Sequence, residues 1–237
     1  MNRKLFSLLC LALAVTTASL CASPVRDDLA AKNIADTDSS APLPYGAIPV
    51  EYIESTGTQY IDTGVQISSS VDITAKIEIL TLLNYYDIII GGRNSNSNNG
   101  RWIFPGGNVS SLRLCYGAAQ SGVVGRPSGG PYTFSKVGNN CYVDDVLKYS
   151  ITGTLDEATK KNIWLFSGSG YANPLTWRSA ARIFFCCLIE DGEIVFDCIP
   201  VRFPNELGEW EGAMYDFVSE TLFRNQGTGS FIIGPDL

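Results

Sequence analysis

Histidine is absent from this chain of 237 residues, and only 17% of its residues are charged. The lack of histidine removes the commonest general base of enzymes and the commonest protein ligand for zinc. It also excludes Ser–His and Cys–His catalytic pairs, and the sequence contains no G-x-S-x-G motif. No C-x-x-C spacing is present either. These absences argue against the common hydrolase and zinc-protein classes.

Positive charge is scarce, and the formal net charge is −7. An acidic surface repels polyanions, so we expect neither nucleic acid nor an anionic membrane surface as a partner. Apolar residues nevertheless make up 45% of the chain, and glycine contributes 23 residues. This composition suits one large globular domain with a buried core and many turns.

Residues 1–22 have the pattern of an export signal. Asn2-Arg3-Lys4 is a basic start, and an apolar stretch with small residues towards its end follows up to Leu20. The stretch falls short of the roughly 20 apolar residues of a spanning helix, so we expect no membrane span after signal removal. Acylation of Cys21 is the alternative, but the bulky Leu20 before it disfavours a lipoprotein signal. We expect export to the periplasm, the cell surface or the medium.

Residues 23–46 are rich in Ala, Asp and Ser and predict a flexible tether, so the folded domain is expected at residues 47–237. Within that range, short β-rich runs recur at about 8–12 residue intervals without a long amphipathic helix. The clearest run, Val71 to Leu80, alternates apolar and polar residues as a half-buried antiparallel strand does. The pattern predicts an all-β fold, a two-sheet antiparallel sandwich or jelly roll.

The longest β-rich segment, residues 181–202, consists of two apolar runs joined by Asp191-Gly192. Asp-Gly is typical of a two-residue hairpin with a type I′ turn. This hairpin would pair Ile189 with Ile194 and Cys187 with Phe196. One face would then carry Ile183, Phe185, Cys187, Ile189, Ile194, Phe196 and Cys198. Because both faces are mostly apolar, we expect the hairpin inside a layered structure.

Seven cysteines are present, of which signal removal would leave Cys115, Cys141, Cys186, Cys187 and Cys198. An odd number implies at least one free thiol or an intermolecular bridge. In the hairpin above, Cys187 and Cys198 are diagonal neighbours whose β-carbons lie roughly 7–8 Å apart, too far for a relaxed disulfide. Cys186 points to the other face. We therefore expect the three hairpin cysteines to be buried free thiols, and a Cys115–Cys141 bridge stays open.

Four phrases in order along the chain resemble the concanavalin A-like, laminin-G-like jelly-roll modules of exported gut-bacterial proteins and of phage structural proteins. The phrases are EYIESTGTQYIDTG (51–64), IIGGRN (89–94), ARIFFCCLIEDGEIVFDCIPVR (181–202) and GAMYDFVSETLFRNQGTGSFIIGP (212–235). The resemblance implies two antiparallel sheets curved over each other, and it carries no catalytic motif and no defined ligand. The chain departs from the pattern at Phe185 and Cys187, where more polar residues are expected.

Laminarinase-like relatives of this fold hydrolyse glycosides with carboxylates in an E-x-D-x-x-E pattern, which this chain lacks. Glu190, Asp191 and Glu193 lie in or beside a turn, so we expect no enzyme activity. No cofactor is expected, although laminin-G-like modules can bind calcium. The candidate calcium ligands are Asp62, Asp87, Asp144 and Asp145.

Glycan binding needs exposed aromatic rings for stacking, together with polar groups that bind hydroxyls. The candidate residues, which lie around an Asn-rich loop and a Gly/Asn/Pro loop, are Arg93, Asn94, Trp102, Tyr171, Asn173 and Trp177. For Trp102 and Trp164 the alternative is a place in the core, which we expect for Trp164 inside the apolar run IWLF. The leading hypothesis is an exported, non-enzymatic binding module with glycan as its ligand. The alternative is a structural or adhesion protein that binds surface proteins and has no sugar site.

Overall fold

The computed structural model describes residues 43–82, 87–93, 101–108, 111–116, 119–120, 124–125, 130–152, 161–169 and 179–237. They belong to one unit, Leu43–Leu237. Within these ranges every regular element is a β-strand, apart from the short 3-10 turn η1 at Pro44–Gly46. No helix in the described ranges is long and apolar enough to cross a membrane.

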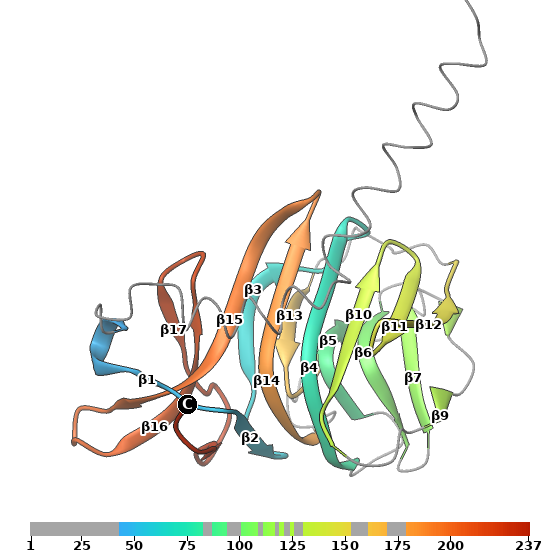
Figure 1. Cartoon of the computed structure of the whole chain (residues 1–237). Coiled ribbons are helices and arrows are strands. Elements are labelled where there is room, and N and C mark those ends of the chain that lie inside the picture. Colours follow the sequence, from blue (N-terminus) through green and yellow to red (C-terminus); the bar gives the residue numbers. More distant parts are fainter. Residues whose placement is uncertain are drawn as a thin grey trace, which may run out of the picture. The chain divides into compact units, whose positions relative to one another are not determined.

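The larger of two sheets has eleven strands, and its main path runs β12-β11-β10-β4-β14-β15-β16-β17 (Figure 1). The bounds along this path are β12 (Val146–Ser150), β11 (Asn140–Val143), β10 (Tyr132–Val137), β4 (Val71–Leu82), β14 (Ser179–Glu190), β15 (Glu193–Pro204), β16 (Trp210–Asp216) and β17 (Thr221–Phe223). Beside this path, β1 (Ile48–Pro49) pairs with β15, and β2 (Ile53–Thr56) pairs with β14 and with β18 (Ile232–Ile233). An isolated bridge joins Val50 to Asp236. All of these pairings are antiparallel.

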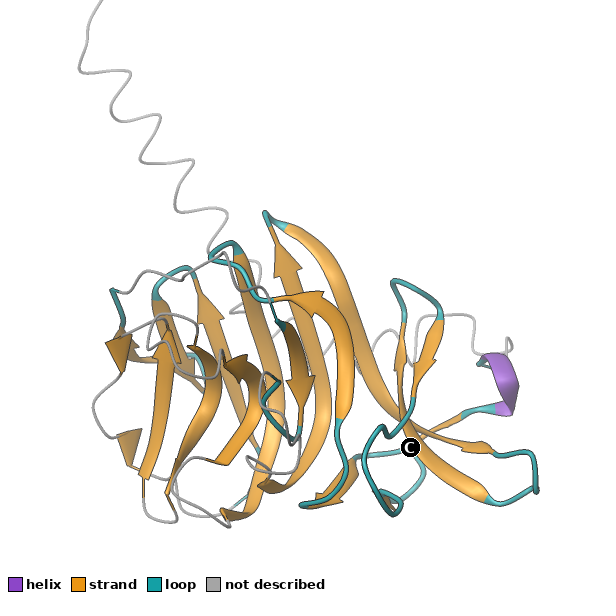
Figure 2. Ribbon diagram, turned by 180° about the vertical axis from the view of Figure 1, so that it is seen from behind, coloured by secondary structure: helices purple, strands orange, loops and turns teal. Residues whose placement is uncertain are grey.

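The smaller sheet has seven strands in the order β3-β13-β5-β6-β7-β8, with β9 paired to β7. Its strands are β3 (Ile61–Gln66), β13 (Asn162–Leu165), β5 (Asp87–Arg93), β6 (Arg101–Asn108), β7 (Ser111–Tyr116), β8 (Ala119–Gln120) and β9 (Val124–Gly125). Figure 2 shows the protein from behind, where the smaller sheet lies in front of the larger one. The prediction of an all-β fold with two antiparallel sheets is confirmed.

The core lies between the two sheets and takes residues from both. The larger sheet contributes Ile73 and Ile77 of β4, and the smaller sheet contributes Ile61, Ile90 and Leu165. The alternation predicted for β4 is present, because its five apolar positions from Val71 to Ile79 are buried. Apolar area removed from water on both inner faces is the main source of stability for such a sandwich.

The turn of the central hairpin is as predicted. Asp191 and Gly192 have φ angles of 51° and 86°, which a type I′ turn requires at both positions. Glu190 pairs with Glu193, and Ile189 pairs with Ile194.

Further from the turn the predicted register is wrong. A β-bulge at Val195 shifts the pairing by one residue, so that Leu188 lies opposite Phe196 and Cys187 lies opposite Asp197. A bulge inserts one unpaired residue, and a one-residue shift exchanges the faces of a strand. A second irregularity, between Ile183 and Phe185, affects the pairing of β14 with β4.

The two bulges change which hairpin residues reach the core. The core cluster includes Ile183, Cys186, Leu188, Phe196 and Cys198. Phe185 and Cys187 were predicted to share the face of Ile183, but they pair with Lys76 and Thr74, which alternate away from the core residues of β4. In this structure Cys141 and all three hairpin cysteines are buried free thiols, as expected for the hairpin, and Cys141 takes part in no disulfide.

Candidate functional site

Most of the glycan-site residues predicted from the sequence lie outside the described part of the chain. This holds for Asn94, Tyr171, Asn173 and Trp177. Arg93 and Trp102 are described through their backbone: Arg93 ends β5 and pairs with Arg101, and Trp102 pairs with Gly92. The fold therefore brings Arg93 and Trp102 to consecutive register positions on neighbouring strands of the smaller sheet.

The outer face of the smaller sheet can be followed along β3 and β13. Ile61, Ile163 and Leu165 are fully buried in the core. Successive side chains of a strand point to opposite faces, so the residues between and beside them point away from the core. These residues are Tyr60, Asp62, Asn162 and Trp164, all half-buried. We call this set the Tyr60–Trp164 face.

Two aromatic rings form the centre of this face. Tyr60 and Trp164 are stacked, with 4.4 Å between ring centroids and 21° between ring planes. Trp164 also lies between Asp62 on β3 and Gly91 on β5 in the strand register. Because Gly91 has no side chain, only backbone lies beside the indole at that register position. The indole N–H is buried and has no acceptor within the described residues, an arrangement that costs about 1–3 kcal/mol unless an acceptor is supplied.

Polar groups lie directly beside the rings. Asp62 accepts one hydrogen bond from the Asn162 side-chain amide at 3.2 Å and another from the Gly64 backbone N–H at 2.9 Å. Burial raises the pKa of the Tyr60 phenol above its usual value, and the negative charge of Asp62 raises it further. The phenol is therefore a hydrogen-bond donor at neutral pH. The face thus combines stacked rings with a carboxylate, an amide and a hydroxyl.

Trp164 is a residue that the sequence interpretation misplaced. The apolar run from Ile163 to Phe166 predicted a core position, yet the indole lies on the opposite face from its two fully buried neighbours. The alternation rule would have placed Trp164 and Tyr60 correctly, if the run had been treated as a one-sided strand. The run contains no polar residue because Trp164, an aromatic residue, occupies the position between Ile163 and Leu165 that points away from the core.

The candidate calcium ligands are separated or already engaged. Asp144 and Asp145 have φ angles of 48° and 60° and form the turn between β11 and β12. Asp144 also accepts a hydrogen bond from the Thr133 N–H at 2.9 Å. The side chain of Asp87 lies outside the described residues. Among the side chains that the structure describes, no group of three or more Cys, Asp or Glu residues is placed to hold a metal ion.

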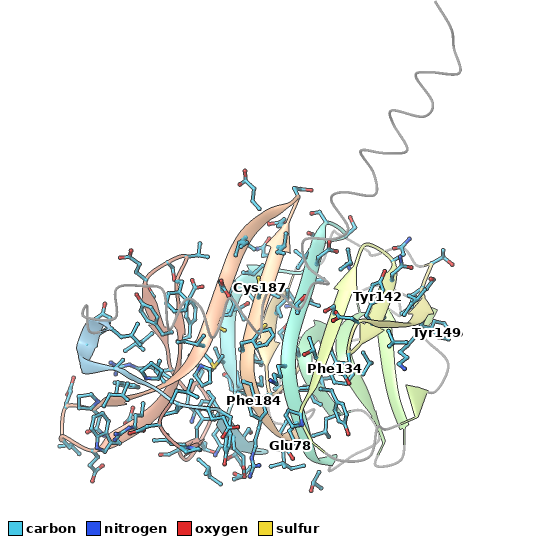
Figure 3. All side chains as sticks on the ribbon, in the orientation of Figure 1. Glu78, Phe134, Tyr142, Tyr149, Phe184 and Cys187 are labelled. Atoms are coloured by element: carbon cyan, nitrogen blue, oxygen red, sulfur yellow. The ribbon has the colours of Figure 1, made fainter. Side chains whose placement is uncertain are left out.

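Two carboxylates of the larger sheet bind the same arginine, Arg182. Glu54 and Glu78 both bind Arg182, at 2.7 Å to its Nε and 2.9 Å to its Nη1 (Glu78 is labelled in Figure 3). The guanidinium also stacks over the Tyr52 ring at 4.3 Å. The hydrogen bond to Glu54 is the main cause that raises the pKa of Arg182. The cation occupies the space between the carboxylates, so this cluster is an ion-pair network.

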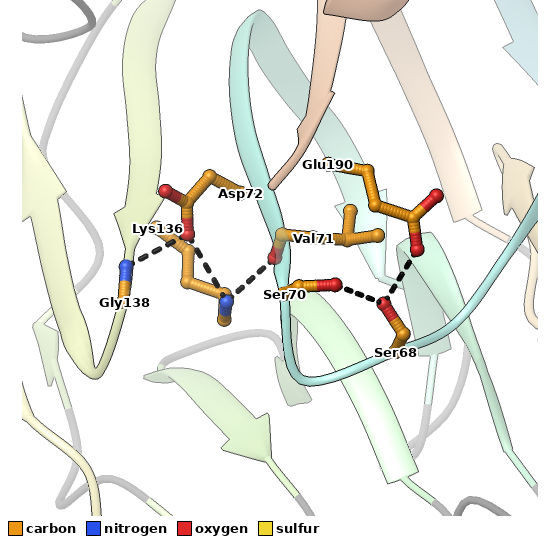
Figure 4. Close-up of polar contacts among 7 residues, drawn as sticks. All are labelled: Ser68, Ser70, Val71, Asp72, Lys136, Gly138 and Glu190. Carbon is orange, nitrogen blue, oxygen red and sulfur yellow. Dashed lines mark hydrogen bonds and ion pairs between the residues drawn. The ribbon is translucent and has the colours of Figure 1, made fainter. Parts of the chain in front are cut away.

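A buried lysine of β10, Lys136, binds the first residue of the neighbouring strand β4. Lys136 Nζ donates to the Val71 carbonyl at 2.6 Å and contacts Asp72 at 3.4 Å, and Asp72 accepts from the Gly138 N–H at 2.7 Å (Figure 4). Burial lowers the pKa of Lys136, and the charge of Asp72 opposes this shift. In the same view, Ser68 donates to Glu190 at 2.9 Å. These contacts satisfy buried polar groups at the strand ends and need no ligand to explain them.

Comparison with protein-family models, with curated proteins and with solved structures finds no match for this chain.

Proposed function

We propose that this chain is an exported, non-enzymatic module with a concanavalin A-like jelly-roll fold, and that it binds carbohydrate at the Tyr60–Trp164 face. The observation that carries the proposal is the stacked ring pair on an outer sheet face, with Asp62 and Asn162 beside it. Sugar rings present apolar C–H faces that stack on aromatic side chains, while their hydroxyls pair with carboxylates and amides.

The face is held in place before any ligand arrives. Tyr60 donates its backbone N–H to the Asn225 side chain at 3.2 Å, and its carbonyl accepts from the Gln226 N–H at 2.9 Å. Thr63 binds the Ile163 carbonyl at 2.8 Å and so fixes β3 to β13. A rigid platform loses little conformational freedom when it binds, which favours affinity for a weakly interacting ligand such as a sugar.

The strand register extends the proposed site towards a residue chosen from the sequence. Trp164 pairs with Gly91, and Arg93 is two positions further along β5. Positions two apart in a strand belong to the same face. In the strand register, Arg93 therefore belongs to the same face of β5 as Gly91, the partner of Trp164.

The non-enzymatic part of the proposal is supported by the environments of the acidic residues. Inverting and retaining glycosidases need two carboxylates about 5–9 Å apart with a free path to the substrate. Glu54 and Glu78 are both bound to Arg182, whose guanidinium lies between them. Export, to the periplasm, the cell surface or the medium, is supported by the basic start and the apolar stretch of residues 1–22.

The test is a glycan array probed with the full chain, in calcium and in chelator, followed by titration calorimetry on the hits. The Trp164→Ala change should lower the affinity at least tenfold, because it removes half of the stacked pair. Trp210→Ala is the matched control, since Trp210 is 46% exposed but belongs to β16 of the larger sheet. Loss of binding in chelator would add a metal to the site. The proposal fails if no glycan binds in either condition, or if both variants bind like the unchanged chain.

A second candidate function, protein binding in a structural or adhesion role, is favoured by β12. All five residues of this strand are exposed, including Val146 at 54%, Leu147 at 52% and Tyr149 at 39%. β12 ends the strand order of the larger sheet in the described part of the chain. An exposed apolar edge strand is a surface that another chain can extend by β-pairing. If the chain binds no glycan on the array, this edge is the surface to test for a protein partner.

A further inference from the structure

The bulge at Val195 brings two cysteines face to face. Cys186 of β14 and Cys198 of β15 are direct cross-strand partners, twelve residues apart in sequence. Both belong to the core cluster and neither is exposed. The thiol of Cys198 donates to the Cys186 carbonyl at 3.3 Å.

The backbone spacing of such a pair matches that of a disulfide. Residues directly opposite in antiparallel strands have Cα atoms about 4.5–5.5 Å apart, and disulfides span Cα separations of about 4.4–6.8 Å. Cys187 lies opposite Asp197 and shares neither the register nor the face of this pair. The sequence-based register, without the bulge, had separated Cys186 from Cys198 and removed this pairing from consideration.

We propose that Cys186 and Cys198 form a disulfide across the central hairpin when the chain folds in an oxidising environment. One thiolate attacks a small disulfide oxidant such as oxidised glutathione, which gives a mixed disulfide and one reduced glutathione. The second thiolate then displaces the other glutathione and closes the bridge. Two electrons pass from the two protein sulfurs to the oxidant, and the two thiol protons end on the two glutathione molecules.

The environment of the pair determines when the bridge forms. Burial raises the pKa of the Cys198 thiol well above its usual value, and contact with Cys186 raises it further. The thiolate is the reacting species in disulfide exchange, so the folded, reduced pair reacts slowly. The bridge therefore forms during folding, when the two strands of the hairpin have paired but the cysteines are still accessible. Once formed, the bridge is protected from reductants by the same burial.

The experiment refolds the full chain from denaturant in oxidised glutathione and, in parallel, in a reducing buffer. A Cys187→Ala background removes the ambiguity of two adjacent cysteines. After alkylation and proteolysis, mass spectrometry should show a peptide that links position 186 to position 198 in the oxidised sample alone. The oxidised sample should also melt roughly 5–10 °C higher than the reduced one, because a bridge over a short loop limits the unfolded chain.

The same background carrying Cys198→Ala is the control, and its melting temperature should not depend on the redox buffer. If this variant does not fold, the comparison of the two redox samples in the Cys187→Ala background still decides the question. The proposal is overturned if Cys186 and Cys198 are both alkylated in the folded, oxidised chain, or if Cys198 is linked to another cysteine instead. Neither residue belongs to the Tyr60–Trp164 face, so this outcome would leave the carbohydrate proposal untouched.

Discussion

Two isoleucines of the central hairpin provide a direct measure of how the sandwich is stabilised. The sequence pattern alone puts Ile183 and Ile194 on one face of the hairpin. In the structure Ile183 is fully buried, in register with Ile77 of β4 and Ile53 of β2, whereas Ile194 is 49% exposed. Changing each residue to alanine removes the same three carbon atoms. The two changes therefore differ in burial and not in chemistry.

The size of the effect follows from that burial. Removing three buried carbons costs about 2.4 kcal/mol in transfer free energy, at roughly 0.8 kcal/mol each. The cavity left between rigid neighbouring strands adds to this, so we expect Ile183→Ala to lower the free energy of unfolding by about 3–4 kcal/mol. For Ile194→Ala we expect about 0.5 kcal/mol, because much of its side chain is already in water.

Urea unfolding at neutral pH, followed by tryptophan fluorescence, measures both variants against the unchanged chain. The slopes of the transitions should agree, so that midpoints compare directly. The reasoning would be refuted if the two variants lost similar amounts of free energy, or if Ile194→Ala lost more. Either result would mean that the register irregularities of β14 and β15 do not place Ile183 and Ile194 on opposite faces of the hairpin.

Two further predictions concern the backbone and the pH dependence. A β-carbon at Gly227 would overlap the Thr58 carbonyl, so Gly227→Ala should cost about 2–3 kcal/mol in thermal unfolding, against about 1 kcal/mol for Gly192→Ala, where φ is 86° but the space is open. Burial raises the pKa of the Cys141 thiol from 9.0 to about 11. A raised thiol pKa gives stability that is complete below pH 9 and lost as the pH rises through 11. The unchanged chain should therefore lose about 2–3 kcal/mol more than Cys141→Ala over this interval, in urea titrations at a series of pH values. Equal pH profiles for the two chains, or equal costs for the two glycines, would contradict these assignments.

Local sequence rules predicted the parts of the fold that depend on neighbouring residues. The alternation of β4 and the turn at Asp191-Gly192 follow from side-chain period and from backbone conformation, and both are confirmed. The bulge at Val195 was not predictable in this way, because it depends on which of two apolar faces packs better against the other sheet. A hairpin with two apolar faces carries no local signal for that choice.

The candidate site shows the same division. The sequence predicted Arg93 and Trp102 as neighbours because they are close along the chain, and their strands do pair, but consecutive register positions belong to opposite faces of a sheet. Tyr60 and Trp164 come together only because β3 pairs with β13, about one hundred residues further along the chain, as the bond from Thr63 to Ile163 shows. A pattern within one strand can tell which way a ring points, but not which strand lies beside it.

The pairing of β2 has a consequence for how the protein is made. β2 lies near the start of the domain, and it is completed by β14 on one side and β18 on the other, while Val50 bridges to Asp236. A nascent chain cannot finish this part of the sheet until residues near 236 have left the ribosome. The long sequence separation of these pairs also makes folding slow, since distant segments must meet before their contacts contribute. Late closure of the sheet keeps the chain unfolded for longer, a property that suits the export proposed above.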